Sequence, residues 1–229
     1  MARDLALFEA LEAGEPGAPP TLRLYAWRPW AVSLGSHQEP ARALDLAALA
    51  ARGYDWVRRP TGGRAVLPAD ENTYALAAPL AGPFAAGLAS THRRIAAALA
   101  RFYRGLGLSV ALTRPAPPAL LDPRSPAPCF AAPGLAELAV AGRKLAGSAQ
   151  RRGRRAFLQH GSLPLGPAHL ELALLLPLDP AARLRYQEGL AAQTVSLGEL
   201  LPALPPRESL EAALAAAFAE EFAVVWLGA

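Results

Sequence analysis

The chain has 229 residues, of which 52% are hydrophobic and 18% charged, and its formal net charge is +4. This composition can bury a full core, which excludes a disordered chain and predicts one globular domain over residues 1–229. The single cysteine excludes an internal disulfide framework. The apolar runs are too short to span a bilayer, and no signal peptide is recognised at the start of the sequence. These features predict a cytoplasmic protein without membrane contacts.

The first third of the chain alternates short helices with short strands. Apolar residues recur at helical spacing over residues 2–13, and a second helix begins after the capping residue Asp45 and ends at Gly53. Strands are predicted over residues 21–25, 31–34, 56–59, 64–67 and 73–76. We expect the last two of these strands to pair as a hairpin across the 68–72 turn.

The longest predicted helix spans residues 84–105, followed by a strand over 108–112 and a proline-rich loop over 115–128. Ala141-Gly142 predicts a tight hairpin turn. Further strands are predicted over residues 137–140, 144–145, 156–165 and 224–227, and helices over 180–192 and 208–221. Hairpins are as frequent as β–α–β units, so the predicted fold class is α+β, a mixed, largely antiparallel β-sheet flanked by helices.

Two residues are conspicuous because each is the only one of its kind. Lys144 is the only lysine beside 22 arginines, and Cys129 is the only cysteine. A position that keeps lysine suggests a need for a compact, titratable amine, which could activate a thiol nucleophile nearby. A lone cysteine is also commonly a small buried hydrophobe. From the residues alone, both interpretations of Cys129 stay open.

The other chemically suggestive residues have plainer alternatives. The segment 60–64 (PTGGR) can be a simple turn, or a place where a ligand lies against bare backbone. His160 is expected to be a hydrogen-bonded structural histidine, and the isolated positions of the remaining histidines predict no metal site. The arginine pairs and clusters come without a nucleic-acid recognition motif or an aromatic stacking platform, so we expect no nucleic-acid partner.

Three groups of residues along the chain form distinct blocks. The first is RRPTGGRAVL at residues 58–67, followed by Glu71 and Thr73-Tyr74. The second comprises GRKLAGSAQ at 142–150 and LQHGS at 158–162. An N-terminal strand pair carries WRP at 27–29, SLG at 33–35 and Gln38. In their order along the chain, these blocks resemble the lipoate-protein ligase A and octanoyltransferase branch of the biotin/lipoate ligase superfamily. The resemblance covers most of the chain and implies the catalytic-domain fold of biotin and lipoate protein ligases.

Within that superfamily, the chain resembles the cysteine-dependent octanoyltransferases. It carries Gly62-Gly63-Arg64 where ATP-dependent ligases typically have three glycines, and Cys129-Phe130 precedes the lysine block. The resemblance implies transfer of an octanoyl group from acyl carrier protein, through a thioester on Cys129, to a lysine of a lipoyl domain such as glycine cleavage H protein. Lys144 would activate the thiol, and no cofactor would be needed.

The resemblance also implies a set of site residues. The catalytic pair is Cys129 and Lys144, and no metal is expected. The predicted substrate-binding residues are Arg59, Thr61, Gly62, Gly63, Arg64, Tyr74, Gly147, Ser148, Ala149, His160 and Gly161.

The chain departs from the family pattern at two places and leaves two other functions open. Pro68-Ala69-Asp70 stands where the family usually has His-Asp, and residues 133–138 differ from the usual segment after Cys-Phe, so the sequence does not fix the acyl length. One alternative is an ATP-dependent lipoate ligase using ATP and Mg²⁺. The other is a non-catalytic module that binds lipoyl domains or acyl carriers.

Overall fold

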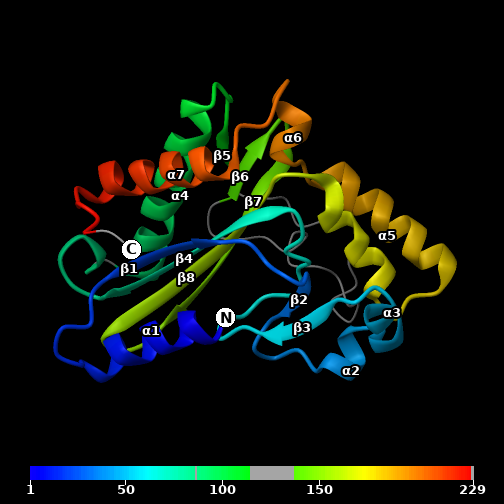
Figure 1. Cartoon of the computed structure of the whole chain (residues 1–229), viewed down its shortest axis with the longest axis horizontal. Coiled ribbons are helices and arrows are strands. Elements are labelled where there is room, and N and C mark those ends of the chain that lie inside the picture. Colours follow the sequence, from blue (N-terminus) through cyan, green and yellow to red (C-terminus); the bar gives the residue numbers. More distant parts are fainter. Residues whose placement is uncertain (86, 114–136, 228–229) are drawn as a thin grey trace.

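A six-stranded antiparallel sheet forms the centre of the molecule (Figure 1). The computed structural model describes residues 1–85, 87–113 and 137–227. In spatial order the strands are β1 (Thr21–Tyr25), β4 (Glu71–Pro79), β8 (Ala156–Pro164), β7 (Arg143–Arg152), β6 (Glu137–Val140) and β5 (Ala111–Thr113).

A second, two-stranded parallel sheet lies beside the large one and consists of β2 (Ala31–Leu34) and β3 (Asp55–Arg58). The connection between these strands contains α2 (Pro40–Ala43) and α3 (Leu46–Ala51). Asp45 caps α3 by accepting a hydrogen bond from the Ala48 amide at 2.9 Å, which confirms the predicted cap.

Helices cover both faces of the large sheet (Figure 1). The alternation of side chains along β4 sends Tyr74 and Leu76 towards α4 (Leu88–Gly105) and α7 (Arg207–Phe222). The intervening Ala75 and Ala77 pack against Phe8 of α1 (Ala2–Ala13) on the other face. Small alanines on this face let α1 approach closely at one end of the sheet.

Of the remaining elements, η3 (Pro167–Leu175) joins the apolar cluster of β2 and packs against α3 and α5 (Pro180–Gln193). The short elements η1 (Gly82–Phe84) and α6 (Leu197–Leu200) instead join the core of the large sheet through Phe84 and Leu197. Ser196 and Glu199 form a capping box at the start of α6. Over residues 1–85, 87–113 and 137–227, none of the helices is long and apolar enough to cross a membrane.

Two predicted strands are wrong. Residues 64–67 make only a bridge from Val66 to Ser33, and β4 pairs instead with β1 and β8, so the predicted hairpin does not form. The chain reverses before β4 at Asp70, whose φ is +47° and whose carbonyl accepts the amide of Leu165. Residues 224–227 run back along α7, and Trp226 Nε1 donates to the Ala215 carbonyl of that helix at 2.9 Å. This segment therefore packs on the helix and does not pair as the expected strand.

The predicted α+β architecture and the hairpin at Ala141-Gly142 are confirmed, with φ values of +49° and +79° at the turn. The strand predicted over 108–112 begins three residues later, at Ala111. The two N-terminal strands, β1 and β2, are both present but belong to different sheets. The chain between them therefore crosses from the large sheet to the small one, and this crossing forms one wall of the cavity described next.

Candidate active site

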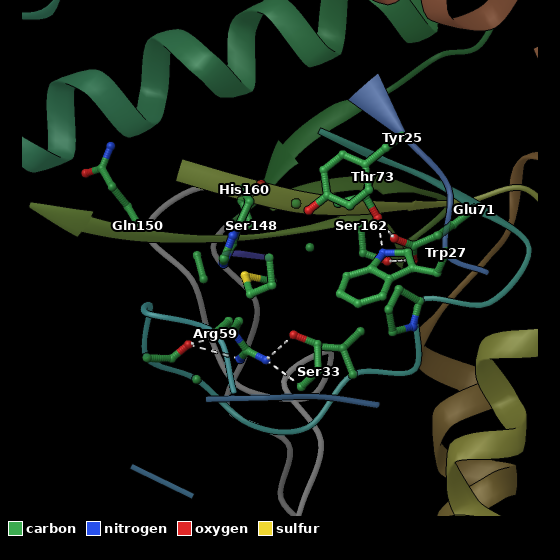
Figure 2. A pocket seen from close by; sticks show the side chains of 18 of the residues that line it. Tyr25, Trp27, Ser33, Arg59, Glu71, Thr73, Ser148, Gln150, His160 and Ser162 are labelled. Carbon is green, nitrogen blue, oxygen red and sulfur yellow. Dashed lines mark hydrogen bonds between the residues drawn. The ribbon is translucent and has the colours of Figure 1, made fainter. Parts of the chain in front are cut away.

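A cavity of about 290 Å³ lies between the large sheet and the small one (Figure 2). Strands β4, β7 and β8 supply one wall, which includes Thr73, Ala149 and Ser162. The opposite wall comes from β2 and the loop that follows β3, where Arg59 and Ser33 lie. Segments far apart in the sequence thus enclose one space.

The Gly62-Gly63 loop is shaped by a buried arginine. Arg59 is 3% exposed, and its guanidinium donates to the carbonyls of Ser33 at 2.6 Å, Gly62 at 3.0 Å and Arg64 at 2.7 Å. The loop also lies directly on the end of β2, since a Cβ at Gly35 would be 1.9 Å from the Gly63 oxygen. Arg59 therefore holds the backbone of this wall in place.

A side-chain hydrogen bond links this loop to the sheet. Thr61 Oγ1 lies 2.6 Å from His160 Nε2, and both residues are buried. Burial, helped by the positive charge of Arg59, lowers the pKa of His160 to about 3, so the imidazole is neutral at physiological pH. The bond connects β8 to the loop and fixes the width of the cavity between them.

Lys144 lies at the cavity and forms an ion pair with Glu137. The two residues come from adjacent strands, β7 and β6, and each is 8% exposed. The Lys144 ammonium donates to Glu137 Oε1. The only lysine of the chain is therefore a buried cation whose charge is balanced by a neighbouring carboxylate.

A second carboxyl, Glu71, lies in the same cavity in a different environment. It is 2% exposed and accepts hydrogen bonds from the hydroxyls of Thr73 and Ser162 (Figure 2). Trp27 Nε1 donates to Thr73 Oγ1 at 2.8 Å. Burial raises the pKa of Glu71 to about 8, although the two hydroxyls and the charge of Arg207 act in the opposite direction.

Most of the predicted substrate-binding residues converge on this cavity. Those that line it, together with the predicted catalytic lysine, are Arg59, Gly62, Gly63, Lys144, Gly147, Ser148, Ala149, His160 and Gly161. Thr61 does not line the cavity itself but forms a hydrogen bond with His160, which does. Cys129 lies outside the described residues.

Besides Thr61, two predicted binding residues, Tyr74 and Arg64, are not among those lining the cavity. Tyr74 points to the opposite face of the sheet, where its hydroxyl lies 2.8 Å from Ser148 Oγ and accepts from Gln159. A Cβ at Gly161 would be 2.4 Å from the Tyr74 ring, so that ring needs a glycine beside it. Arg64 contributes its carbonyl to Arg59. Tyr74 and Arg64 thus act on the cavity walls in this structure.

Sequence reasoning missed Glu71, Trp27 and Ser162 as site residues, although each stands in or beside a block that resembles the family. The period of two along β4 places Glu71 on the same face as Thr73, which could have indicated the carboxyl. Within the described part of the chain, no group of three or more His, Cys, Asp and Glu side chains could hold a metal ion.

The family model described as "Lipoyl protein ligase A/B catalytic domain" matches residues 1–219. The chain belongs to this family. It is 42% identical over 225 residues to an octanoyltransferase LipM of Kyrpidia tusciae, covering 96% of this chain and 81% of that relative. It is 38% identical to an octanoyltransferase LipM of an Exiguobacterium species, covering 99% of this chain and 83% of the relative. These relatives confirm the prediction that the chain is an acyltransferase.

Solved structures confirm the fold. A bipartite lipoate protein ligase of Thermoplasma acidophilum superposes with a TM-score of 0.77 at 20% identity, covering 100% of this chain and 82% of that one. A lipoate-protein ligase A bound with ATP gives a TM-score of 0.72 at 20% identity, covering 100% of this chain and 84% of the other. The predicted catalytic-domain fold of biotin and lipoate ligases is therefore correct.

Proposed function

We propose that this protein transfers an octanoyl group from acyl carrier protein to a lysine of a lipoyl domain, such as glycine cleavage H protein, through a thioester on Cys129. The observation that carries the proposal is the 42% identity to an octanoyltransferase over 96% of the chain. The cavity supports it, because it brings the Gly62-Gly63 loop and Lys144 to one place.

The reaction has two half-reactions. In the first, the thiolate of Cys129 attacks the carbonyl carbon of the octanoyl thioester on the carrier, and the carrier's thiolate leaves and takes up a proton. In the second, an amine of the acceptor attacks the acyl-Cys129 carbonyl, and the cysteine sulfur leaves. Exchange of one thioester for another is nearly neutral in free energy, and formation of the amide drives the second half-reaction. The reaction therefore requires no ATP and no cofactor.

Lys144 stabilises the thiolate of Cys129 and takes part in proton transfer, as we propose for the catalytic pair. Its burial supports this role, because a cation at 8% exposure acts through a lower dielectric than a cation in water. The hydrogen bond to Glu137 orients the amine of Lys144. The apolar and glycine-rich parts of the wall, such as Gly147 and Ala149, leave room for an acyl chain.

The test is intact-mass measurement after incubation with octanoyl-acyl carrier protein in the absence of ATP. We expect a mass increase of one octanoyl group that hydroxylamine removes, and no increase in Cys129→Ala. Because the chain has one cysteine, a thioester adduct can form at only one position. Full transfer activity of Cys129→Ala would overturn the thioester mechanism.

The same assay separates the two alternatives. An ATP-dependent lipoate ligase would form no adduct from the carrier and would modify the lipoyl domain from free lipoate and ATP. A binding module would show neither reaction and would still bind the carrier or the lipoyl domain. The arginine-rich surface, with a net charge of +4 for the whole chain, suits association with acidic partners, so binding alone does not distinguish the enzyme from a module.

A further inference from the structure

Glu71 is the carboxyl of the cavity for which the thioester mechanism gives no role. Its oxygens accept from Thr73 and Ser162, and among the described residues it forms no salt bridge. Glu137, the second carboxyl that the described residues contribute to the cavity, is already paired with the ammonium of Lys144. Glu71 is therefore the carboxyl that can pair with a cation entering from outside.

The surroundings of Glu71 keep it in one orientation. Trp27 donates to Thr73 Oγ1, and the Thr73 hydroxyl then donates to Glu71 Oε1. Ser162 donates to the other oxygen, Oε2. Both hydroxyls thus point their protons at the carboxyl, an arrangement that stabilises its charged form and leaves further lone pairs for another donor.

Glu71 also borders a second cavity, of about 430 Å³. Among the described residues, Trp27 and Glu71 are the two that line both cavities, so they lie where the cavities adjoin. The second cavity has exposed residues on its rim, including Arg28 and Asp70.

We propose that Glu71 is a catalytic residue of the second half-reaction, which pairs with the ammonium group of the acceptor lysine and takes its proton before attack. The proposal rests on the proposed function, since it requires an acyl-enzyme. A lysine ammonium has a pKa of about 10.4 and arrives protonated, whereas only the free amine is a nucleophile. The cavity must therefore contain a group that removes a proton.

The atoms of this step balance. The ammonium gives one proton to the Glu71 carboxylate, and the resulting amine forms a bond to the acyl carbon. The carbon–sulfur bond of the thioester breaks, and the sulfur takes the second proton from nitrogen. The products are the amide, the free thiol and a neutral Glu71, which then loses its proton to water.

The charged and titratable groups that face Glu71 set its pH range. Arg207 at the start of α7 donates to the Glu71 carbonyl at 2.6 Å. The negative charge of ionised Glu71 contributes to the raised pKa of Tyr25 in β1 and of Tyr103 in α4. Lys144 and Glu137 line the same cavity as a pair. Burial raises the pKa of Glu71 to about 8, so the ionised fraction that can accept a proton, and with it the rate of the second half-reaction, should increase as the pH rises towards 8.

The experiment measures the two half-reactions separately in Glu71→Gln, which keeps the size of the side chain. Acyl-enzyme formation from octanoyl-acyl carrier protein should remain within about twofold of wild type. Transfer to the lipoyl-domain lysine should fall by roughly 100-fold or more, the usual loss when a general base is removed. Release of the acyl group by hydroxylamine, a neutral nucleophile, should be unchanged.

Glu220→Gln is the matched control, because Glu220 is 63% exposed and pairs with Arg101 away from the cavity. It should leave all three rates unchanged. In Ser162→Ala, loss of a hydrogen bond that favours ionised Glu71 should move the pH midpoint of the second half-reaction upward. The proposal would be overturned if the rate of transfer to the lipoyl-domain lysine in Glu71→Gln stayed within about threefold of wild type. It would also be overturned if the rates with lysine and with hydroxylamine fell equally. Absence of any acyl-enzyme in the wild type would instead refute the proposed function.

Discussion

Replacement of Gly35 by alanine should distort the cavity without touching any ionisable residue. The new Cβ would stand 1.9 Å from the Gly63 oxygen, whereas real contacts of this kind stay above 3.0 Å, so the loop must move by about 1.1 Å. The obstacle is backbone, and Arg59 holds the neighbouring carbonyls in place. Overpacking of this kind costs about 1–3 kcal/mol, and a displacement near 1 Å in an active site costs roughly 100-fold in rate.

The assays are urea unfolding and the rate of acyl-enzyme formation from octanoyl-acyl carrier protein. Gly105→Ala is the matched control, since a Cβ there meets nothing within 4 Å and the residue ends α4. This control should leave the free energy of unfolding and the rate near wild type. Two results together would refute the claim that the Gly35–Gly63 contact positions the wall. The free energy of unfolding of Gly35→Ala would lie within about 0.5 kcal/mol of wild type, as for an ordinary surface change, and its rate of acyl-enzyme formation would be unchanged.

Three further changes test the buried polar groups. Lys144→Met leaves Glu137 buried without its cation and should lower the free energy of unfolding by about 3–5 kcal/mol, and adding Glu137→Met should restore most of it, measured by urea unfolding. Glu71 keeps its proton in the folded state up to about pH 8 but loses it near 4.5 when unfolded, so the folded state binds more protons and stability falls as pH rises through this window. The loss is on the order of 4 kcal/mol, and urea unfolding of wild type at successive pH values should show it, whereas Glu71→Gln should give a flatter curve. Thr61→Val removes the partner of His160 Nε2 and should lower the free energy of unfolding by about 1–3 kcal/mol, with a slower acyl-enzyme step.

Local sequence patterns were sufficient where structure depends on neighbouring residues. The turn at Ala141-Gly142 and the cap at Asp45 follow from backbone freedom and a side chain that reaches three residues along the chain. The helical spacing of residues 2–13 likewise needs no distant partner. These elements could be predicted, and the structure contains them.

Pairing over long distances could not be predicted in the same way. The strand that begins at Glu71 has hydrophobic residues on both faces because helices cover both, so its pattern does not say which strands flank it. The environment of the Glu71 carboxyl comes from Ser162, 91 residues away, and the Glu71 carbonyl bonds Arg207, 136 residues away. The rarity of Lys144 indicated chemistry, but only the structure shows its ion pair with Glu137.

The bond from Arg207 to the carbonyl of Glu71 has a consequence for how the protein is made. During synthesis, β4 leaves the ribosome long before α7, yet the first residue of α7 also donates to Asn72 and thus binds two consecutive residues of that strand. A nascent chain that stops short of residue 207 lacks this support and the helix that covers Tyr74. The cavity can therefore take its final form only after α7 has been translated, so a chain that lacks α7 does not present a finished cavity.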